Sequence, residues 1–174
     1  MLYIFGGLPG SGKSTLSQYL AREQQAVYLR IDTIEQALRD AGQLLQGPEG
    51  YMAAYAVAAD NLRQGWGVVA DSVNPLAVTR TAWRNVAAQL SASFVEIEVI
   101  CSDAAEHKHR VETRAVEING FELPTWDDVV GREYEPWDET HVVIDTAGQT
   151  VEQSIAALQQ ALAAAIYQST PSSK

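Results

Sequence analysis

The sequence reads Gly7-Leu8-Pro9-Gly10-Ser11-Gly12-Lys13-Ser14 close to its N-terminus, and Thr15 follows directly. Glycine, four residues, glycine, lysine and then serine or threonine is the pattern of a loop that wraps a polyphosphate. Its glycines let the backbone adopt positive φ angles and turn N–H groups towards phosphate oxygens. Because such a loop joins a buried strand to a helix, the segment predicts an α/β fold.

The last residues of this loop have defined partners. Lys13 reaches the β- and γ-phosphates of a nucleotide, and the Ser14 hydroxyl is a ligand for Mg²⁺. A helix that begins at Lys13 points the positive end of its dipole at the same anion. We therefore expect residues 7–15 to bind ATP together with Mg²⁺.

The rest of the chain alternates between strand-like and helix-like periods, which is typical of a mainly parallel sheet with covering helices. Strands are predicted at residues 2–6, 26–31, 67–70, 94–101 and 141–144. A first helix is predicted to begin at residue 13. After the strand at 26–31, helical structure is predicted up to about residue 63 with a break at 47–48, and further helices over 78–90, over 104–118 and after Thr150. In the 78–90 helix the repeat of Val78, Ala82, Val86 and Leu90 predicts the inner face.

Length and composition predict one domain over residues 1–167 and a frayed tail at 168–174. No apolar run is long enough to cross a bilayer and no basic flank marks a signal peptide, so a cytoplasmic protein is expected. The formal charge of −10 disfavours nucleic acid as a partner, because binding a phosphate backbone requires clustered Lys and Arg. Cys101 is the single cysteine, which excludes an intramolecular disulfide.

Four segments taken together resemble the lid-bearing P-loop kinases: residues 7–15, residues 29–32, residues 71–74 with Arg80, and Arg110 with Arg114. Within that group the chain is similar to chloramphenicol phosphotransferase and to the 5′-kinase domain of polynucleotide kinases. The resemblance implies an α/β, three-layer P-loop NTPase fold with a parallel five-stranded sheet in the order 2-3-1-4-5. It also implies helices on both faces of the sheet and a helical lid at about residues 103–136.

Asp32, Asp71 and Asp145 each close a predicted strand, and ligands in such sheets bind beyond the carboxyl ends of the strands. The resemblance implies that Asp32 is the base that orients the acceptor hydroxyl and takes its proton. Glu35 lies three residues later, so a helix cap is the other interpretation of Asp32. Asp71 ends an apolar strand and either holds Mg²⁺ or orients the acceptor.

Asn74 and Arg80 resemble positions that line the acceptor rim. Their other interpretations are a turn residue before Pro75 and a solvated arginine on a helix. An aromatic pair, Tyr51 and Tyr55, is expected either at the acceptor site or in the core.

Arg110 and Arg114 lie four residues apart, hence on one face of the predicted helix. The resemblance implies that they close over the triphosphate, with Arg132 as a third candidate. Pairing of these arginines with Glu106 and Glu117 on a solvated helix is the alternative. By the same resemblance, adenine is expected near the lid arginine and the loop Thr146-Ala147-Gly148.

A signalling GTPase is disfavoured because the sequence contains no Asn-Lys or Thr-Lys dipeptide. A nucleoside monophosphate kinase needs several arginines for the acceptor phosphate, and residues 33–66 offer only Arg39 and Arg63. The predicted function is therefore an ATP-dependent kinase that phosphorylates a hydroxyl of a small-molecule acceptor. The alternatives are a polynucleotide 5′-hydroxyl kinase and an ATP-binding regulatory module that transfers nothing.

Overall fold

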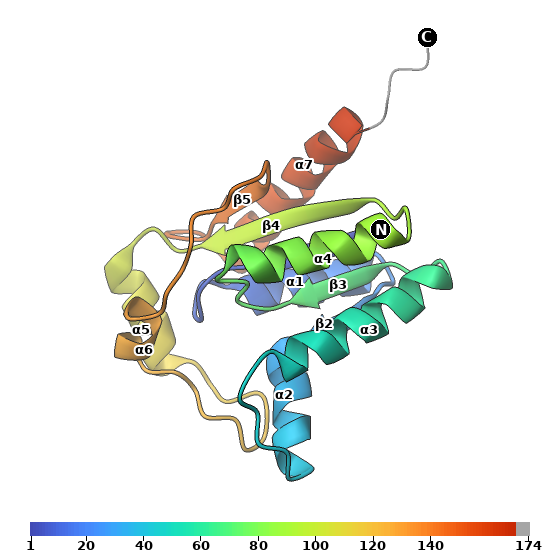
Figure 1. Cartoon of the computed structure of the whole chain (residues 1–174). Helices are drawn as coiled ribbons and strands as arrows, with labels where there is room; N and C mark the ends of the chain where they lie inside the picture. Colours follow the sequence, from blue (N-terminus) through green and yellow to red (C-terminus); the bar gives the residue numbers. More distant parts are fainter. Residues whose placement is uncertain (170–174) are drawn as a thin grey trace.

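The computed structural model describes residues 1–169, and the burial and contacts of side chains up to residue 165. It shows one five-stranded parallel sheet between helices (Figure 1). The strands are β1 (Leu2–Gly6), β2 (Val27–Arg30), β3 (Val68–Asp71), β4 (Phe94–Ile100) and β5 (Val142–Asp145). The helices found in the described residues are α1 (Lys13–Glu23), α2 (Ile31–Asp40), α3 (Glu49–Arg63), α4 (Ala77–Gln89), α5 (Ala104–Thr113), α6 (Trp126–Val130) and α7 (Val151–Ser169). Of the tail expected at residues 168–174, residues 170–174 lie outside the described residues.

The strand order is β2-β3-β1-β4-β5, which confirms the expected topology. The central strand β1 pairs with β3 from Leu2↔Val68 to Phe5↔Asp71 and with β4 from Leu2↔Phe94 to Gly6↔Glu98. All these pairings are parallel, so the strands end at one edge of the sheet. In Figure 1 the arrowheads of β3 and β4 point towards the side on which α5 and α6 lie.

Each face of the sheet has its own buried core, because the side chains of a strand alternate between the two faces. One core contains Phe5, Val69 and Ile97 together with Leu16 of α1 and Leu158 of α7. The opposite core contains Ile4 and Ala70 of the sheet, packed against residues of the helices on that face, among them Ala54 and Ala58 of α3 and Trp83 and Ala87 of α4. The result is a three-layer arrangement that fixes the end of β1.

Two expectations about helices were wrong. The helix predicted over 104–118 ends at Thr113, and Arg114 is already extended, with φ −62° and ψ 145°. The β-branched Val116 and Ile118 and the following Gly120 have low helix propensity, which explains the early end. Val78 does not face inward, because the buried side chains of α4 are those of Arg80, Trp83 and Ala87.

Side chains cap the starts of two helices near the site. The Asp103 side chain caps α5 by accepting from the N–H groups of Ala105 and Glu106, each at 2.9 Å. Thr150 and Gln153 form a reciprocal capping pair at the start of α7, at 2.8 and 3.3 Å. Within residues 1–169, no helix is both long enough and apolar enough to cross a bilayer.

Candidate active site

The glycine-rich loop connects the end of β1 to the start of α1. Gly7, Gly10 and Gly12 have φ angles of +135°, +85° and +92°, a range that side chains rarely allow. Space is also short: an added Cβ would lie 2.1 Å from the Val99 carbonyl oxygen at Gly7 and 2.6 Å from Val111 Cγ2 at Gly10. Backbone conformation and close contact therefore both require glycine here.

The N-terminus of α1 suits an anion. Gly12 is the N-cap residue, and no side chain in the described part of the chain caps this helix. The first N–H groups of a helix lack partners within the helix and carry the positive end of its dipole. The loop and the first turn of α1 thus form a cradle that fits a polyphosphate.

Lys13 is buried and forms an ion pair with Asp71 of β3. Its Nζ lies 2.9 Å from Asp71 Oδ1, and the Tyr28 hydroxyl donates to Asp71 Oδ2 at 2.5 Å. Burial alone would raise the pKa of Asp71, but the Lys13 ammonium and the hydrogen bonds from Tyr28, Lys13 and Ser14 hold it below its ordinary value. Asp71 is therefore a carboxylate at neutral pH.

The donor set fits Mg²⁺, a hard cation that prefers oxygen ligands. The Ser14 hydroxyl lies close enough to Asp71 to lower the pKa of that carboxyl by hydrogen bonding. One hydroxyl and one carboxylate, next to a polyphosphate cradle, match the way Mg²⁺ is held by few protein groups and several phosphate oxygens.

The phosphate loop opens into a pocket of about 790 Å³. Of the expected site residues, the pocket is lined by Leu8, Pro9, Gly10, Gly12, Lys13, Ser14, Thr15, Asp32, Arg110, Arg114 and Arg132. Six of the 12 basic residues of the chain belong to its lining: Lys13, Arg30, Arg39, Arg110, Arg114 and Arg132. An acidic protein has thus concentrated half of its positive side chains around one pocket.

Asp32 lies in the first turn of α2 and lines this pocket. The N-cap residue of α2 is Arg30, so Asp32 is not the cap of this helix. Arg30 lies between two carboxylates, since its Nε is 3.9 Å from Asp32 Oδ2 and its Nη1 is 2.6 Å from Glu117 Oε2. A partly exposed carboxylate therefore lines the same pocket as the phosphate loop.

Arg110 and Arg114, the arginines expected in a lid, do not share a helix face, because α5 ends between them. Arg110 donates to Thr146 through both Nη atoms, at 2.7 Å to Oγ1 and 2.9 Å to the carbonyl oxygen. Arg114 donates to the Pro124 carbonyl oxygen at 3.2 Å. Burial and the nearby Arg30 lower the pKa of Arg114, while Asp32 opposes this shift.

One contact between α5 and the phosphate loop was missed by the sequence reasoning. The His107 ring donates from Nε2 to the Pro9 carbonyl oxygen at 2.9 Å and meets the Trp126 ring edge to face at 5.3 Å. His107 precedes Arg110 by three residues, so the two lie on one face of α5. The spacing of three residues between His107 and Arg110 was the sequence signal from which this contact could have been predicted.

Asn74 and Arg80 lie in the interior rather than at the rim. Both side chains are 0% exposed, and neither residue lines the pocket. Asn74 has a φ of +48°, in keeping with the turn interpretation, while Arg80 is not a solvated helix arginine. The aromatic pair is part of the core: Tyr55 packs on Trp83 at 4.5 Å, and burial raises the pKa of Tyr51 to about 12.

The loop after β5 faces a second pocket of about 250 Å³, which adjoins the first at Gly12, Thr15 and Arg110. Thr146 lines this second pocket and donates to the Ser11 carbonyl oxygen at 2.9 Å. Gly148 does not line it; its φ is +68° and its N–H donates to Glu106 Oε2 at 2.8 Å.

The sheet order, the glycine-rich loop and the buried lysine define a P-loop nucleotide-binding fold. The chain belongs to the AAA domain family, whose model matches residues 2–128. No curated protein is detectably similar to it in sequence.

Solved structures with the same fold include several kinases. APS kinase CysC of Mycobacterium tuberculosis, solved with AMPPNP and APS, is 18% identical and has a TM-score of 0.66, covering 93% of this chain and 96% of its own. A gluconokinase from Sinorhizobium meliloti 1021 is 17% identical, with a TM-score of 0.63 and coverage of 96% of both chains. Kti12 of Chaetomium thermophilum, solved with ADP-AlF3, is 20% identical, with a TM-score of 0.66 and coverage of 92% and 98%. At these identities the likeness concerns the fold.

Proposed function

We propose that this protein is an ATP-dependent kinase that phosphorylates a hydroxyl group of a small-molecule acceptor. The observation that carries the proposal is that Lys13, Ser14 and Asp32 line one pocket of about 790 Å³. A phosphate-binding group and a carboxylate that can act as the base, both lining one pocket, are the parts that phosphoryl transfer requires.

In this proposal the backbone N–H groups of the loop bind the β- and γ-phosphates, and Lys13 donates to the same oxygens. An ammonium group has three donors, so Lys13 can contact phosphate oxygens while it keeps its hydrogen bond to Asp71. When bound through Ser14 near Asp71, Mg²⁺ supplies positive charge that neutralises the phosphate oxygens.

Asp32 is the proposed base. Its carboxylate accepts the proton of the acceptor hydroxyl while the hydroxyl oxygen bonds to the γ-phosphorus. The bond between that phosphorus and the oxygen bridging to the β-phosphate breaks, so that ADP leaves with the bond electrons. Arg110 and Arg114, which line the same pocket, balance the charge on the transferred group.

Pocket composition supports a small, anionic or strongly polar substrate pair over a nucleic acid. Six basic and four acidic side chains line the pocket, whereas the whole chain carries a formal charge of −10. A polynucleotide would need a positive track that extends beyond the pocket. Adenine is proposed to lie in the second pocket, next to Arg110 and Thr146.

The test is an assay of ADP release with ATP, Mg²⁺ and a panel of sugars, nucleosides and other hydroxyl metabolites, with a 5′-hydroxyl oligonucleotide included. Asp32→Asn should abolish acceptor-dependent release while ATP binding remains, and Lys13→Ala should abolish release and greatly weaken ATP binding. Asp60→Asn, at an exposed position on α3, is the matched control and should behave as the wild type. ATP binding without transfer to any acceptor, unchanged in Asp32→Asn, would instead support the regulatory module.

A further inference from the structure

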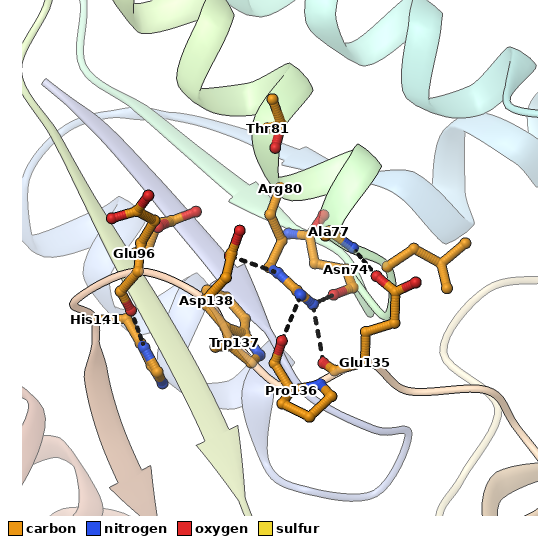
Figure 2. A network of polar contacts seen from close by, with 12 residues as sticks. Asn74, Ala77, Arg80, Thr81, Glu96, Glu135, Pro136, Trp137, Asp138 and His141 are labelled. Atoms are coloured by element: carbon orange, nitrogen blue, oxygen red, sulfur yellow. Dashed lines mark hydrogen bonds and ion pairs between the residues drawn. The ribbon is translucent and has the colours of Figure 1, made fainter.

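A buried arginine, Arg80, lies outside both pockets, between the chain that follows β3 and residues 135–138. Arg80 belongs to the first turn of α4, and its side chain is 0% exposed. Figure 2 shows its guanidinium against residues 135–138. These belong to what we call the return segment, residues 133–141, because it leads the chain from α6 of the lid back to β5.

The guanidinium donates to backbone carbonyls on two sides. Its Nη1 lies 3.1 Å from the carbonyl oxygen of Asn74, which precedes α4, and 3.3 Å from that of Glu135. Its Nη2 lies 2.9 Å from the Pro136 carbonyl oxygen. The Trp137 ring lies 5.0 Å from Arg80 Cζ, as a cation–π contact requires. The planar fork of arginine can satisfy this geometry, whereas the point charge of lysine cannot.

Asn74 connects this contact to the phosphate loop. Its side chain donates from Nδ2 to the Phe5 carbonyl oxygen at 2.8 Å, one residue before the end of β1. The adjacent Val73 accepts the N–H of Gly7, the first loop residue, at 3.0 Å. By binding the Asn74 carbonyl oxygen, Arg80 holds the chain after β3 in the shape that supports the base of the loop.

Trp137 provides a second connection to the same place. An added Cβ on Gly6 would lie 2.4 Å from Trp137 Cζ2, so the ring packs directly on the last residue of β1. Its Nε1 donates to the Tyr134 hydroxyl at 3.0 Å, and that hydroxyl donates to Glu98 Oε1 of β4 at 2.9 Å. The return segment is thus fixed to the strands beside the phosphate loop.

The helix α4 also holds the return segment through its N-terminus. Glu135 accepts the N–H of Ala77 with its side chain, and its own N–H donates to the Pro75 carbonyl oxygen at 2.8 Å. On the outer side, Asp138 Oδ1 lies 4.0 Å from Arg80 Nε and 3.4 Å from Arg84 Nη2. Arg80 contacts both Glu135 and Asp138 and lies at the centre of the cluster (Figure 2).

We propose that Arg80 is a positioning residue that fixes the return segment to the base of the phosphate loop. It thereby sets the placement of the loop and the affinity for nucleotide without touching the nucleotide. The second half of this inference rests on the proposed function, because it needs nucleotide binding, whereas the first half does not.

Backbone hydrogen exchange of the nucleotide-free protein tests the first half. The variants are Arg80→Lys, which keeps the charge, and Trp137→Leu, which removes the ring without leaving a buried charge. In both we expect exchange at residues 7–14 and in the lid to rise together, by about tenfold as for the loss of one buried hydrogen bond. Arg63→Lys, an exposed arginine paired with Asp60 on α3, is the control and should leave exchange unchanged.

Calorimetric titration with Mg·ATP tests the second half, and the Kd should rise by a similar factor in both variants. The double variant should raise the Kd little more than either single change, because both changes act on the same contact. Faster exchange confined to the return segment, or a lower unfolding midpoint with loop exchange and Kd as in the wild type, would overturn the proposal. Failure of the wild type to bind Mg·ATP would count against the proposed function, while exchange would still decide the role of Arg80. If Arg80→Lys does not fold, Trp137→Leu decides alone.

Discussion

The ammonium group of Lys13 lies 2.9 Å from Oδ1 of Asp71, where the phosphate loop meets the end of β3. Both side chains are nearly inaccessible, and the second carboxylate oxygen of Asp71 accepts a hydrogen bond from Tyr28 at 2.5 Å. The pair therefore fixes the loop lysine to the sheet, and its removal should affect folding as well as nucleotide binding.

We expect Lys13→Met and Asp71→Asn each to lower the free energy of unfolding by about 3–5 kcal/mol, because each leaves an unpaired buried charge. The double variant should be less destabilised than the sum of the two. Urea unfolding measures all three. The matched control is the exposed pair Lys108–Glu112, at 3.8 Å, whose removal should cost about 0.2–1 kcal/mol. Additive losses at Lys13 and Asp71 would contradict the coupling.

The same pair predicts a pH dependence of stability. The pKa of Asp71 is lowered below its ordinary value of 3.8, so the unfolded chain binds the proton more readily than the folded protein. The stability that Asp71 contributes is fully present above about pH 4 and is lost as the pH falls through the lowered pKa. The difference in unfolding free energy between wild type and Asp71→Asn should therefore be unchanged from neutral pH to about pH 5 and shrink as the pH falls below about 4. A constant difference would show that the shift is absent.

Gly10→Ala should lower the stability of the protein by more than backbone strain alone would. Gly10 has a φ of +85°, and an added Cβ would lie 2.6 Å from Val111 Cγ2 of the lid helix. Gly42 has a φ of +82° with nothing within 4 Å, so Gly42→Ala isolates the strain, about 1–2 kcal/mol. Overpacking at Gly10 should add about 1–3 kcal/mol and weaken Mg·ATP binding. Equal stability of the two variants would argue against the contact between loop and lid.

His107→Phe should loosen the lid from the loop. Phenylalanine can keep the edge-to-face contact with Trp126 but cannot donate to the Pro9 carbonyl oxygen, which accepts from His107 at 2.9 Å. A lost hydrogen bond of about 0.5–1.5 kcal/mol corresponds to a rise of roughly 2- to 10-fold in the Kd for Mg·ATP. His109→Phe, on the exposed side of α5, provides the comparison and should bind as the wild type does. Identical affinities of His107→Phe and the wild type would show that His107 does not contribute to Mg·ATP binding.

The fold could be predicted from the sequence because its signals are local. One glycine-rich segment and alternating periodicity place five strands, and the resemblance implies their order, which the structure confirms. The boundary at Thr113 was missed because the charged pattern continues beyond the helix, although Val116 and Ile118 weaken it.

Side-chain placement depends on contacts between distant segments and could not be predicted in this way. Arg80 is 55 residues from Glu135 in sequence, yet its guanidinium binds that carbonyl oxygen in the interior. An arginine in a helix is usually solvated, and only the return segment, which follows the lid, turns this one into a buried contact. The partner of Lys13 likewise comes from another strand, with Asp71 lying 58 residues away.

Titration of the protein with Mg·ATP, compared with Lys13→Ala, tests the central claim most directly. The claim is that residues 7–15 hold a nucleotide polyphosphate between backbone amides and one ammonium group. We expect saturable binding by the wild type and a Kd roughly 10- to 100-fold higher in a folded Lys13→Ala variant, as for the loss of charge-assisted hydrogen bonds. No binding by the wild type, or equal affinity in the two proteins, would contradict it.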